Sequence, residues 1–391
     1  MDIEALRART PGTAHRTHLN NAGAGLMSQT TLDAVIEHLG LESRIGGYEA
    51  ETAAQDLITS AYAGLAQLVH GRDDQIALFD NSTHAWNAAG YSVPLKPGDR
   101  IITGRDEYGS AVLAYFQIAR RTGAEIVVIP NDASGQIDLD ALRAEVDERT
   151  KMIGLTWIPT SGGLINPAAE VGAIAREADT LFLLDATQAV GQLPIDVTEL
   201  GCDFLTGTGR KFLRGPRGTG FLWVGDRALD RVEPPVVEIQ SADWNGGRGF
   251  RFAEGARQFA TWEMSCANVI GFGAAVRQAL ELGLDEIAER AIALGARLRD
   301  ALAGIPGVTT HDLGERRCAI VTARVDGHDA EQVGARLAED GINVTTTVAR
   351  HNPFDTEVRD VHPLVRFSPH YYNTEAELDR AVTAVAKIVA Q

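Results

Sequence analysis

The chain has 391 residues, of which 45% are hydrophobic and 23% are charged, a composition that is ordinary for a globular protein with a sizeable core. Its 36 Lys and Arg residues stand against 53 Asp and Glu residues, a net charge of −17 that phosphate backbones and anionic lipid would repel, so binding to nucleic acids or membranes is not expected. The three cysteines form no CxxC pair or disulfide framework, and the N-terminus lacks the apolar run of a signal peptide. Both features favour a reducing, cytoplasmic location.

Short apolar runs alternate with longer amphipathic stretches in the middle of the chain. The predicted strands cover residues 75–79, 100–103, 125–129, 152–157, 180–184, 204–206 and 220–224. Helical patterns lie between most of them, at residues 83–90, 109–121, 139–148 and 167–177. This alternation is typical of an α/β domain with a mostly parallel, seven-stranded sheet that helices cover on both faces. Ligands of such sheets bind at the carboxyl ends of the strands.

The pattern changes from about residue 266, where two long helical stretches follow each other up to residue 302. A smaller α+β domain is predicted after them, with strands at 318–325, 342–346 and 364–368, a helix at 330–338 and a last helix. Thr374 and Glu377 have the spacing of a capping box at the start of that helix. We expect an N-terminal segment (1–60) that wraps onto both domains, a large domain (61–265), and a linking helix with a small C-terminal domain (266–391).

A strand-end carboxylate and a loop lysine stand out in residues 181–224. Asp185 ends a fully apolar strand, where a buried carboxylate is costly unless it is paired. Lys211 follows another short strand, in the Gly-rich run Gly207-Thr208-Gly209-Arg210-Lys211. Pyridoxal phosphate needs both groups, a lysine for a Schiff base and a carboxylate that keeps its pyridine nitrogen protonated. The pair therefore predicts a site for this cofactor, although a strand-end Asp is also a common cap of a turn or helix.

Other strand ends offer what the rest of this cofactor requires. Its phosphate needs backbone N–H groups at a helix start with hydroxyl groups beside them. The segment that follows the first predicted strand fits this need with Ser82, Thr83 and His84. Ser82 and Thr83 are also ordinary helix-capping residues. Tyr108 follows the second strand and could cover the ring, with packing at the rim as the alternative, and Gln188 could reach the ring hydroxyl.

These residues resemble the cofactor core of a known family, the class V aminotransferases. The family belongs to the fold-type I pyridoxal-phosphate enzymes and includes cysteine desulfurases, selenocysteine lyases, kynureninases and isopenicillin N epimerase-like proteins. The resemblance covers nearly the whole chain and is carried by residues 18–23, Asp185-x-x-Gln188, Gly209-Arg210-Lys211-x-x-x-Gly215-Pro216, residues 258–261 and residues 364–368.

The resemblance implies a role for each matching residue. Lys211 is the catalytic lysine, Asp185 pairs with the pyridine nitrogen, and Arg366 clamps the α-carboxylate of an amino-acid substrate. The other implied cofactor contacts are Ser82, Thr83, His84, Tyr108, Thr160, Gln188, Thr208, Arg210 and Thr261. Family members are dimers with shared active sites, so a homodimer is expected in which Thr261, and with it Tyr48, reaches the neighbouring subunit.

The chain departs from the family pattern in three places. Arg210 replaces the usual His before the lysine, and as a fixed cation it cannot act as a base. Thr160 stands where many members have Asn. Residues 345–352, where cysteine desulfurases carry a catalytic Cys, contain none, so desulfurase activity is not expected. Cys318 starts an apolar strand and is expected to be buried rather than reactive.

Four stretches resemble a subgroup, the C–S lyases of the ergothioneine pathway and related natural-product enzymes that act on S-conjugated cysteines. They are Gly46-Gly47-Tyr48-Glu49-Ala50, residues 210–218, Trp262-Glu263 and His370-Tyr371-Tyr372-Asn373-Thr374. This resemblance implies a β-lyase that splits an S-conjugated cysteine or its sulfoxide into a thiol or sulfenate, pyruvate and ammonia. Asn21 is a further candidate for a substrate contact. Tyr48, His84, Arg350 and His370 are candidates for contacting the sulfur-bearing arm or protonating the leaving group, with a surface or packing role as the alternative for each.

Other readings of the same residues remain open. Transamination, epimerisation and decarboxylating deamination use the same cofactor, and the sequence does not choose among them. A catalytically inactive member of the fold is disfavoured because Lys211, Asp185 and Arg366 occur together. A dinucleotide-binding oxidoreductase is disfavoured because no strand precedes Gly271-Phe272-Gly273, which a helix–helix contact explains better. No metal site is expected.

Overall fold

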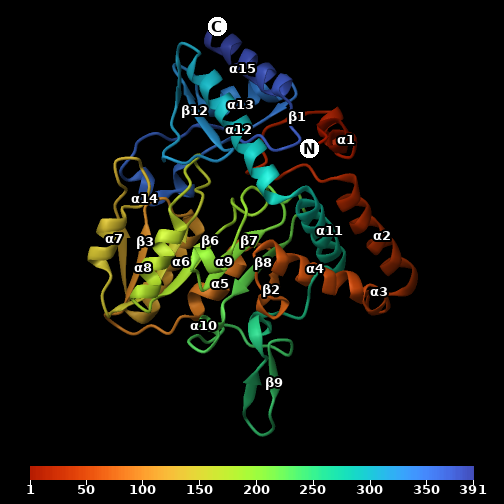
Figure 1. The fold of residues 1–391 in the computed structure, drawn as a ribbon, viewed down its shortest axis with the longest axis vertical. Helices are drawn as coiled ribbons and strands as arrows, with labels where there is room; N and C mark the ends of the chain where they lie inside the picture. The colour runs from red at the N-terminus through yellow and green to blue at the C-terminus, as the bar shows by residue number, and fades with distance from the viewer.

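A seven-stranded sheet forms the centre of the larger part of the protein in the computed structural model, which describes residues 1–391 (Figure 1). Its strand order is β2-β8-β7-β6-β5-β3-β4. The strands are β2 (Ile76–Phe79), β3 (Arg100–Gly104), β4 (Glu125–Ile129), β5 (Thr150–Thr156), β6 (Leu181–Asp185), β7 (Phe204–Thr208) and β8 (Gly220–Val224). Only β8 runs antiparallel to its neighbours. The predicted α/β class is confirmed, and each strand lies within two residues of its predicted bounds.

Helices cover both faces of this sheet because its central strands are apolar on both sides. Alternation along β6 sends Phe182 and Leu184 into one core cluster and Leu181 and Leu183 into the other. The helices between the strands are α5 (Ser82–Ser92), α6 (Gly109–Thr122), α7 (Leu139–Glu145), α8 (Ala168–Glu177) and α9 (Val197–Leu200), with α10 (Asp226–Leu229) after β8.

A four-stranded antiparallel sheet lies in the smaller region, at the top of Figure 1, in the order β11-β12-β15-β14. Its strands are β11 (Val308–Thr310), β12 (Val321–Val325), β14 (Thr345–Thr346) and β15 (Val365–Phe367). The helices of this region are α12 (Leu284–Ala303), α13 (Ala330–Glu339), α14 (Pro353–Thr356) and α15 (Glu375–Val389). The predicted capping box of Thr374 and Glu377 at α15 is confirmed. The predicted start of a strand at Cys318 is wrong, because its N–H donates to Gly163 O (2.7 Å), outside the sheet.

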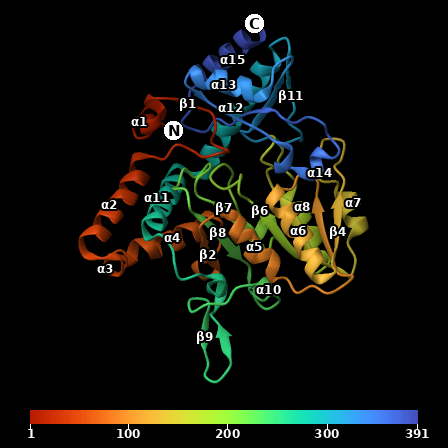
Figure 2. The ribbon, with the colours of Figure 1, turned by 180° about the vertical axis from the view of Figure 1, so that it is seen from behind.

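The N-terminal segment contacts both regions. It contains α1 (Ile3–Ala8), β1 (Thr17–His18), α2 (Gln29–Ile45), α3 (Gly47–Ala53) and the start of α4 (Gln55–Leu68). β1 pairs in parallel with β13 (Ile342–Asn343), whereas α2 and α4 pack against α11 (Cys266–Leu282) beside the large sheet (Figures 1 and 2). The divisions after residues 60 and 265 stay predictions, and α4 runs across the first of them.

The glycines of α11 allow close helix packing. A Cβ atom on Gly271 would lie 2.4 Å from Val35 Cγ2 of α2, and one on Gly273 would lie 2.8 Å from Ala61 Cβ of α4. These distances leave no room for a side chain. The helix–helix interpretation of this Gly-rich run is therefore confirmed.

A β-hairpin projects from the bottom of the molecule in Figure 1. It was not predicted from the sequence. Its strands are β9 (Ala242–Trp244) and β10 (Phe250–Phe252). The Asn245-Gly246-Gly247 turn between aromatic residues was an available signal, and φ is 88° at Gly246 and 62° at Gly247, a backbone region that favours glycine. None of the protein's helices combines the length and apolarity required to cross a membrane.

Candidate active site

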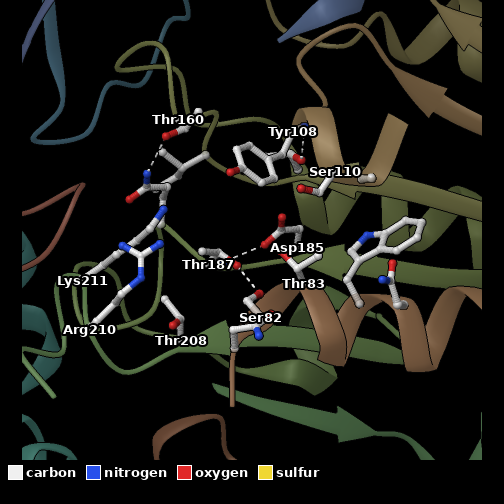
Figure 3. Close-up of a pocket in the computed structure, with 17 residues that line it drawn as sticks. Ser82, Thr83, Tyr108, Ser110, Thr160, Asp185, Thr187, Thr208, Arg210 and Lys211 are labelled. Carbon is white, nitrogen blue, oxygen red and sulfur yellow. Dashed lines mark hydrogen bonds between the residues drawn. The ribbon is translucent and has the colours of Figure 1, made fainter. Parts of the chain in front are cut away.

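A polar pocket lies where β2, β3, β5, β6 and β7 end at one edge of the large sheet (Figure 3). The strands bring side chains from distant parts of the chain to this edge, because parallel strands share one carboxyl end. The sequence-predicted residues that line the pocket are Ser82, Thr83, Tyr108, Thr160, Asp185, Gln188, Thr208, Arg210 and Lys211. The structure thus assembles most of the expected cofactor contacts around Lys211.

Asp185 and Lys211 are buried titratable residues that line this pocket. Asp185 is the last residue of β6, and its Oδ1 accepts hydrogen bonds from the Thr187 N–H (2.9 Å) and the Thr206 hydroxyl (3.5 Å), which leaves Oδ2 available. Burial raises the pKa of Asp185, against the effects of Thr187 and Lys211. Burial, followed by the charges of Arg210 and Arg366, lowers the pKa of Lys211 well below its ordinary value. This environment favours the neutral amine, which can attack a carbonyl group or accept a proton.

The loop that carries Lys211 is fixed by its backbone. The Gly25 N–H donates to Arg210 O (2.8 Å), and the Gly215 N–H donates to Gly209 O (2.7 Å). A Cβ atom on Gly25 would lie 2.5 Å from Lys211 O, so glycine is required where the N-terminal segment crosses the loop. These contacts hold the lysine at the end of β7.

The start of α5 offers an anion site beside the lysine. Asn81 caps this helix by accepting the His84 N–H (2.9 Å), so the capping alternative for Ser82 and Thr83 is wrong. The Ser82 hydroxyl is instead hydrogen-bonded to that of Thr187. The N–H groups of the first helical turn and the neighbouring hydroxyls suit the phosphate of the predicted cofactor.

Arg366 approaches the pocket from β15, behind Thr160. It is 7% exposed, and one terminal nitrogen donates to both Thr160 O and Thr160 Oγ1, each at 2.8 Å. Burial, followed by the charge of Arg210, lowers its pKa to about 10, so it remains a cation near neutral pH. Its Nε has no partner, and neither does Oε1 of Gln188, whose Nε2 donates to Thr160 Oγ1 (3.0 Å). A buried donor and acceptor without partners fit a pocket built for a polar ligand.

Several predicted residues lie outside this pocket. His84 pairs with Asp80 and borders a neighbouring groove with Thr261. Arg350 lies on an exposed turn, η4 (Ala349–His351). Tyr48 is 71% exposed, in a surface groove that it shares with Trp262. These positions do not touch the pocket within one chain.

Asn21 and His370 are buried in the packing beneath the Lys211 loop. Asn21 Nδ2 donates to Ser368 O (2.8 Å), and His370 Nε2 donates to Phe212 O (2.7 Å). Burial, with Arg214 nearby, lowers the pKa of His370 to about 3. These contacts fit the packing alternative for His370, and they give Asn21 a packing role in place of the expected substrate contact.

Residues that the sequence analysis missed complete the pocket wall. Thr187 and Thr156 line it, and Glu107 lies behind it with a hydrogen bond to the Thr156 N–H (2.7 Å). Thr187 lies two residues after Asp185, a local signal that was available. No cysteine lines the pocket. Cys318 is buried as expected, and burial raises its pKa to about 12.

Comparisons with known proteins agree with this geometry. The family model of class V aminotransferases matches residues 17–381. A cysteine desulfurase of Enterobacter sp. (strain 638) is 31% identical over 330 residues, which cover 82% of this chain and 77% of the relative.

Two solved structures share the fold. The apo structure of a cysteine desulfurase from Thermococcus onnurineus NA1 has a TM-score of 0.92 at 22% identity and covers 99% of this chain and 98% of that one. The cystine C–S lyase C-DES, in complex with its reaction product cysteine persulfide, has a TM-score of 0.87 at 23% identity and covers 96% of this chain and 99% of that one. A further structure of C-DES carries glycine covalently linked to its PLP cofactor.

Proposed function

The chain belongs to the class V aminotransferase family, and we propose that it is a carbon–sulfur β-lyase that splits an S-conjugated cysteine or its sulfoxide. Its cofactor is pyridoxal 5′-phosphate (PLP). The products are a thiol or sulfenate, pyruvate and ammonia. The observation that carries the proposal is the presence of Lys211 and Asp185 in one buried pocket that no cysteine lines.

Each part of the pocket has a task in this reaction. PLP supplies an electron-accepting ring and a carbonyl carbon that bonds to amines. Asp185 would hold a proton on the ring nitrogen, and Tyr108 would pack against the ring. Thr83 and Thr208, with the α5 N-terminus, would hold the phosphate. Lys211 would anchor the cofactor, and its amine, which burial favours in the neutral form, would take the proton from the substrate Cα.

Arg366 is proposed to bind the substrate α-carboxylate. A guanidinium that is fixed by Thr160 and still has a free Nε can donate to a carboxylate with a defined geometry. We expect Arg366→Ala to lower kcat/KM for amino-acid substrates by roughly 10- to 100-fold, the size of a lost charge-assisted hydrogen bond. Steady-state kinetics with S-conjugated cysteines and their decarboxylated analogues measures this. An equal loss for both substrate types would contradict the carboxylate role.

The lack of a pocket cysteine favours a lyase over a desulfurase. A desulfurase needs a thiolate to receive the sulfur, whereas Cys202 and Cys318 are buried and Cys266 lies in the Tyr48 groove, outside the pocket of its own chain. The pKa of each of these thiols is raised, chiefly by burial. A β-lyase needs none, because the whole sulfur arm leaves with its electron pair.

The substrate preference tests this proposal. We expect S-alkyl cysteines or their sulfoxides to be turned over at least roughly tenfold faster, in kcat/KM, than free cysteine. A panel of these substrates, followed by substrate loss with purified holoenzyme, gives the comparison. A clear preference for free cysteine, with sulfur recovered on the protein, would contradict it.

A homodimer is also proposed, with Thr261 and Tyr48 reaching the neighbouring subunit's pocket. Its support is that both residues lie outside the pocket of their own chain, and that the β9–β10 hairpin region exposes Ile239 (74%) and Trp244 (78%). Sedimentation equilibrium should give twice the mass of the 41.9 kDa chain, and a monomer at micromolar concentration would contradict the dimer.

A further inference from the structure

Glu107 places a second buried carboxyl group behind Asp185, and the proposed reaction does not use it. Glu107 is 1% exposed and directly precedes Tyr108. Its Oε1 accepts the Thr156 N–H (2.7 Å), and its Oε2 lies 3.1 Å from the Thr156 hydroxyl. Thr156 ends β5 and pairs in register with Asp185 of β6. The Glu107 carboxyl group therefore joins the Tyr108 loop to the strand end that borders Asp185.

The surroundings of Glu107 favour its neutral form. The groups that face it are the Thr156 backbone and hydroxyl, the Thr103 hydroxyl from β3, the buried phenol of Tyr115 from α6, and Asp185 from β6, none of which is a cation. Asp185, in contrast, faces Lys211. Burial, followed by the charge of Asp185, raises the pKa of Glu107 to about 8. Near neutral pH Glu107 is therefore the protonated member of the pair of carboxyl groups.

The hydrogen bonds accommodate this proton. The structure has the Thr156 hydroxyl donating to Oε2; when Oε2 is protonated this bond reverses, so that the acidic hydrogen donates to Thr156 Oγ1 while Oε1 still accepts the Thr156 N–H. Thr156 Oγ1 also accepts the Tyr108 N–H at 3.4 Å, so it would accept two hydrogen bonds. One hydroxyl group thus links the neutral acid to the backbone of the aromatic residue that covers the cofactor ring.

We propose that Glu107 is a positioning residue of the cofactor site, which as a neutral acid fixes the Tyr108 loop and leaves the negative charge of the carboxyl pair on Asp185. The charge then lies on the group that faces the ring nitrogen. The inference rests on the proposed function for the identity of the ring. It does not depend on which reaction follows. Ionisation of Glu107 in alkaline solution would place a second negative charge beside Asp185 and change the environment of the ring.

The first test compares Glu107→Gln with Glu107→Ala in the PLP-loaded protein. Gln reproduces the neutral acid, since its oxygen can accept the Thr156 N–H and its amide can donate to Thr156 Oγ1. At pH 7 we expect Glu107→Gln to bind PLP within about twofold of the parent protein, and Glu107→Ala to bind it roughly tenfold more weakly. The absorbance change of the bound cofactor as the pH rises from 7 to 9 should be smaller in Glu107→Gln. A Gln variant that loses PLP as Ala does, or keeps the full alkaline change, would overturn the proposal.

The second test uses the protein without PLP and is independent of the reaction. A carboxyl group whose pKa rises from 4.5 to about 8 on folding stabilises the fold below pH 4.5, and this stabilisation is lost as the pH rises to 8. Gln has no proton to lose. The Tm of Glu107→Gln relative to the parent protein should therefore be higher at pH 8 than at pH 5. The same relative Tm at both values would overturn the neutral-acid assignment, whatever the catalysed reaction.

Asp106→Asn is the matched control. Asp106 is also buried, and burial with Asp355 nearby raises its pKa to about 7, but its carboxyl group faces Asn131 (3.0 Å) and not Asp185. The Tm of Asp106→Asn relative to the parent protein should depend on pH in the same way as that of Glu107→Gln. The absorbance change of its bound cofactor between pH 7 and pH 9 should equal that of the parent protein. An equal loss of that change in Asp106→Asn would show a general effect of the loop and overturn the specific role of Glu107.

Discussion

Replacing Lys211 by Ala should abolish both the covalent attachment of PLP and turnover. Lys211 is the only lysine of the pocket, and its surroundings favour the neutral amine that attachment and proton transfer require. Loss of the general base alone is worth about 10²–10⁴-fold in rate. After borohydride reduction, the intact mass of the parent protein should include the cofactor, and that of Lys211→Ala should not.

Lys96→Ala is the matched control for this experiment, because Lys96 is exposed and lies outside the pocket. It should retain the adduct and the rate of the parent protein. An adduct of full occupancy in Lys211→Ala would reject the anchoring role and, with it, the assignment of the site.

Asp185→Asn should keep PLP attached and lose most of the catalytic rate. The amide has the size of the carboxylate and can still accept the Thr187 N–H, but it cannot hold a proton on the ring nitrogen. Without that proton the ring is a poor electron sink, and we expect kcat to fall by about 10²–10³-fold, the loss found for other preorganised electrostatic groups. Stopped assays of pyruvate, alongside the reduced-protein mass, separate rate from attachment.

Asp203→Asn controls for the burial of the substituted carboxylate. Asp203 is 2% exposed and accepts hydrogen bonds from Arg227 and from the Phe182 N–H (2.8 Å), at the start of β6 and so at the opposite sheet edge from the pocket. Its substitution should lower Tm and leave kcat per folded molecule nearly unchanged. If Asp185→Asn retained full activity, the pyridinium role would be rejected.

The sequence revealed the core of the site because its signals are local. Asp185 ends the apolar strand β6 and Lys211 lies three residues after the end of β7, and parallel strands bring their carboxyl ends to one edge. The same reasoning identified Ser82 and Thr83, but it could not distinguish a helix-capping role from a cofactor contact. In the structure the cap is Asn81, one residue before Ser82. The helical arrangement around Gly271 was likewise readable, because no strand precedes it.

The missed features depend on tertiary contacts. Glu107 reads as a loop residue in the sequence, and its burial arises only when β5 and α6 close around it. His370 and Asn21 lie in polar motifs, yet the Lys211 loop and β15 bury them. Cys318 begins an apolar run, but its N–H pairs with Gly163 rather than with a strand of the sheet. Local pattern cannot determine which segment covers such residues.

The identity of the three-carbon product tests the central claim most directly. Purified PLP-loaded protein would be incubated with S-methylcysteine sulfoxide and no keto-acid acceptor, and the products followed by mass spectrometry. For a β-lyase we expect pyruvate and ammonia in equal amounts over many turnovers. Alanine as the product would indicate a desulfurase, and a single turnover that leaves the cofactor in its amine form would indicate an aminotransferase; either result would contradict the β-lyase.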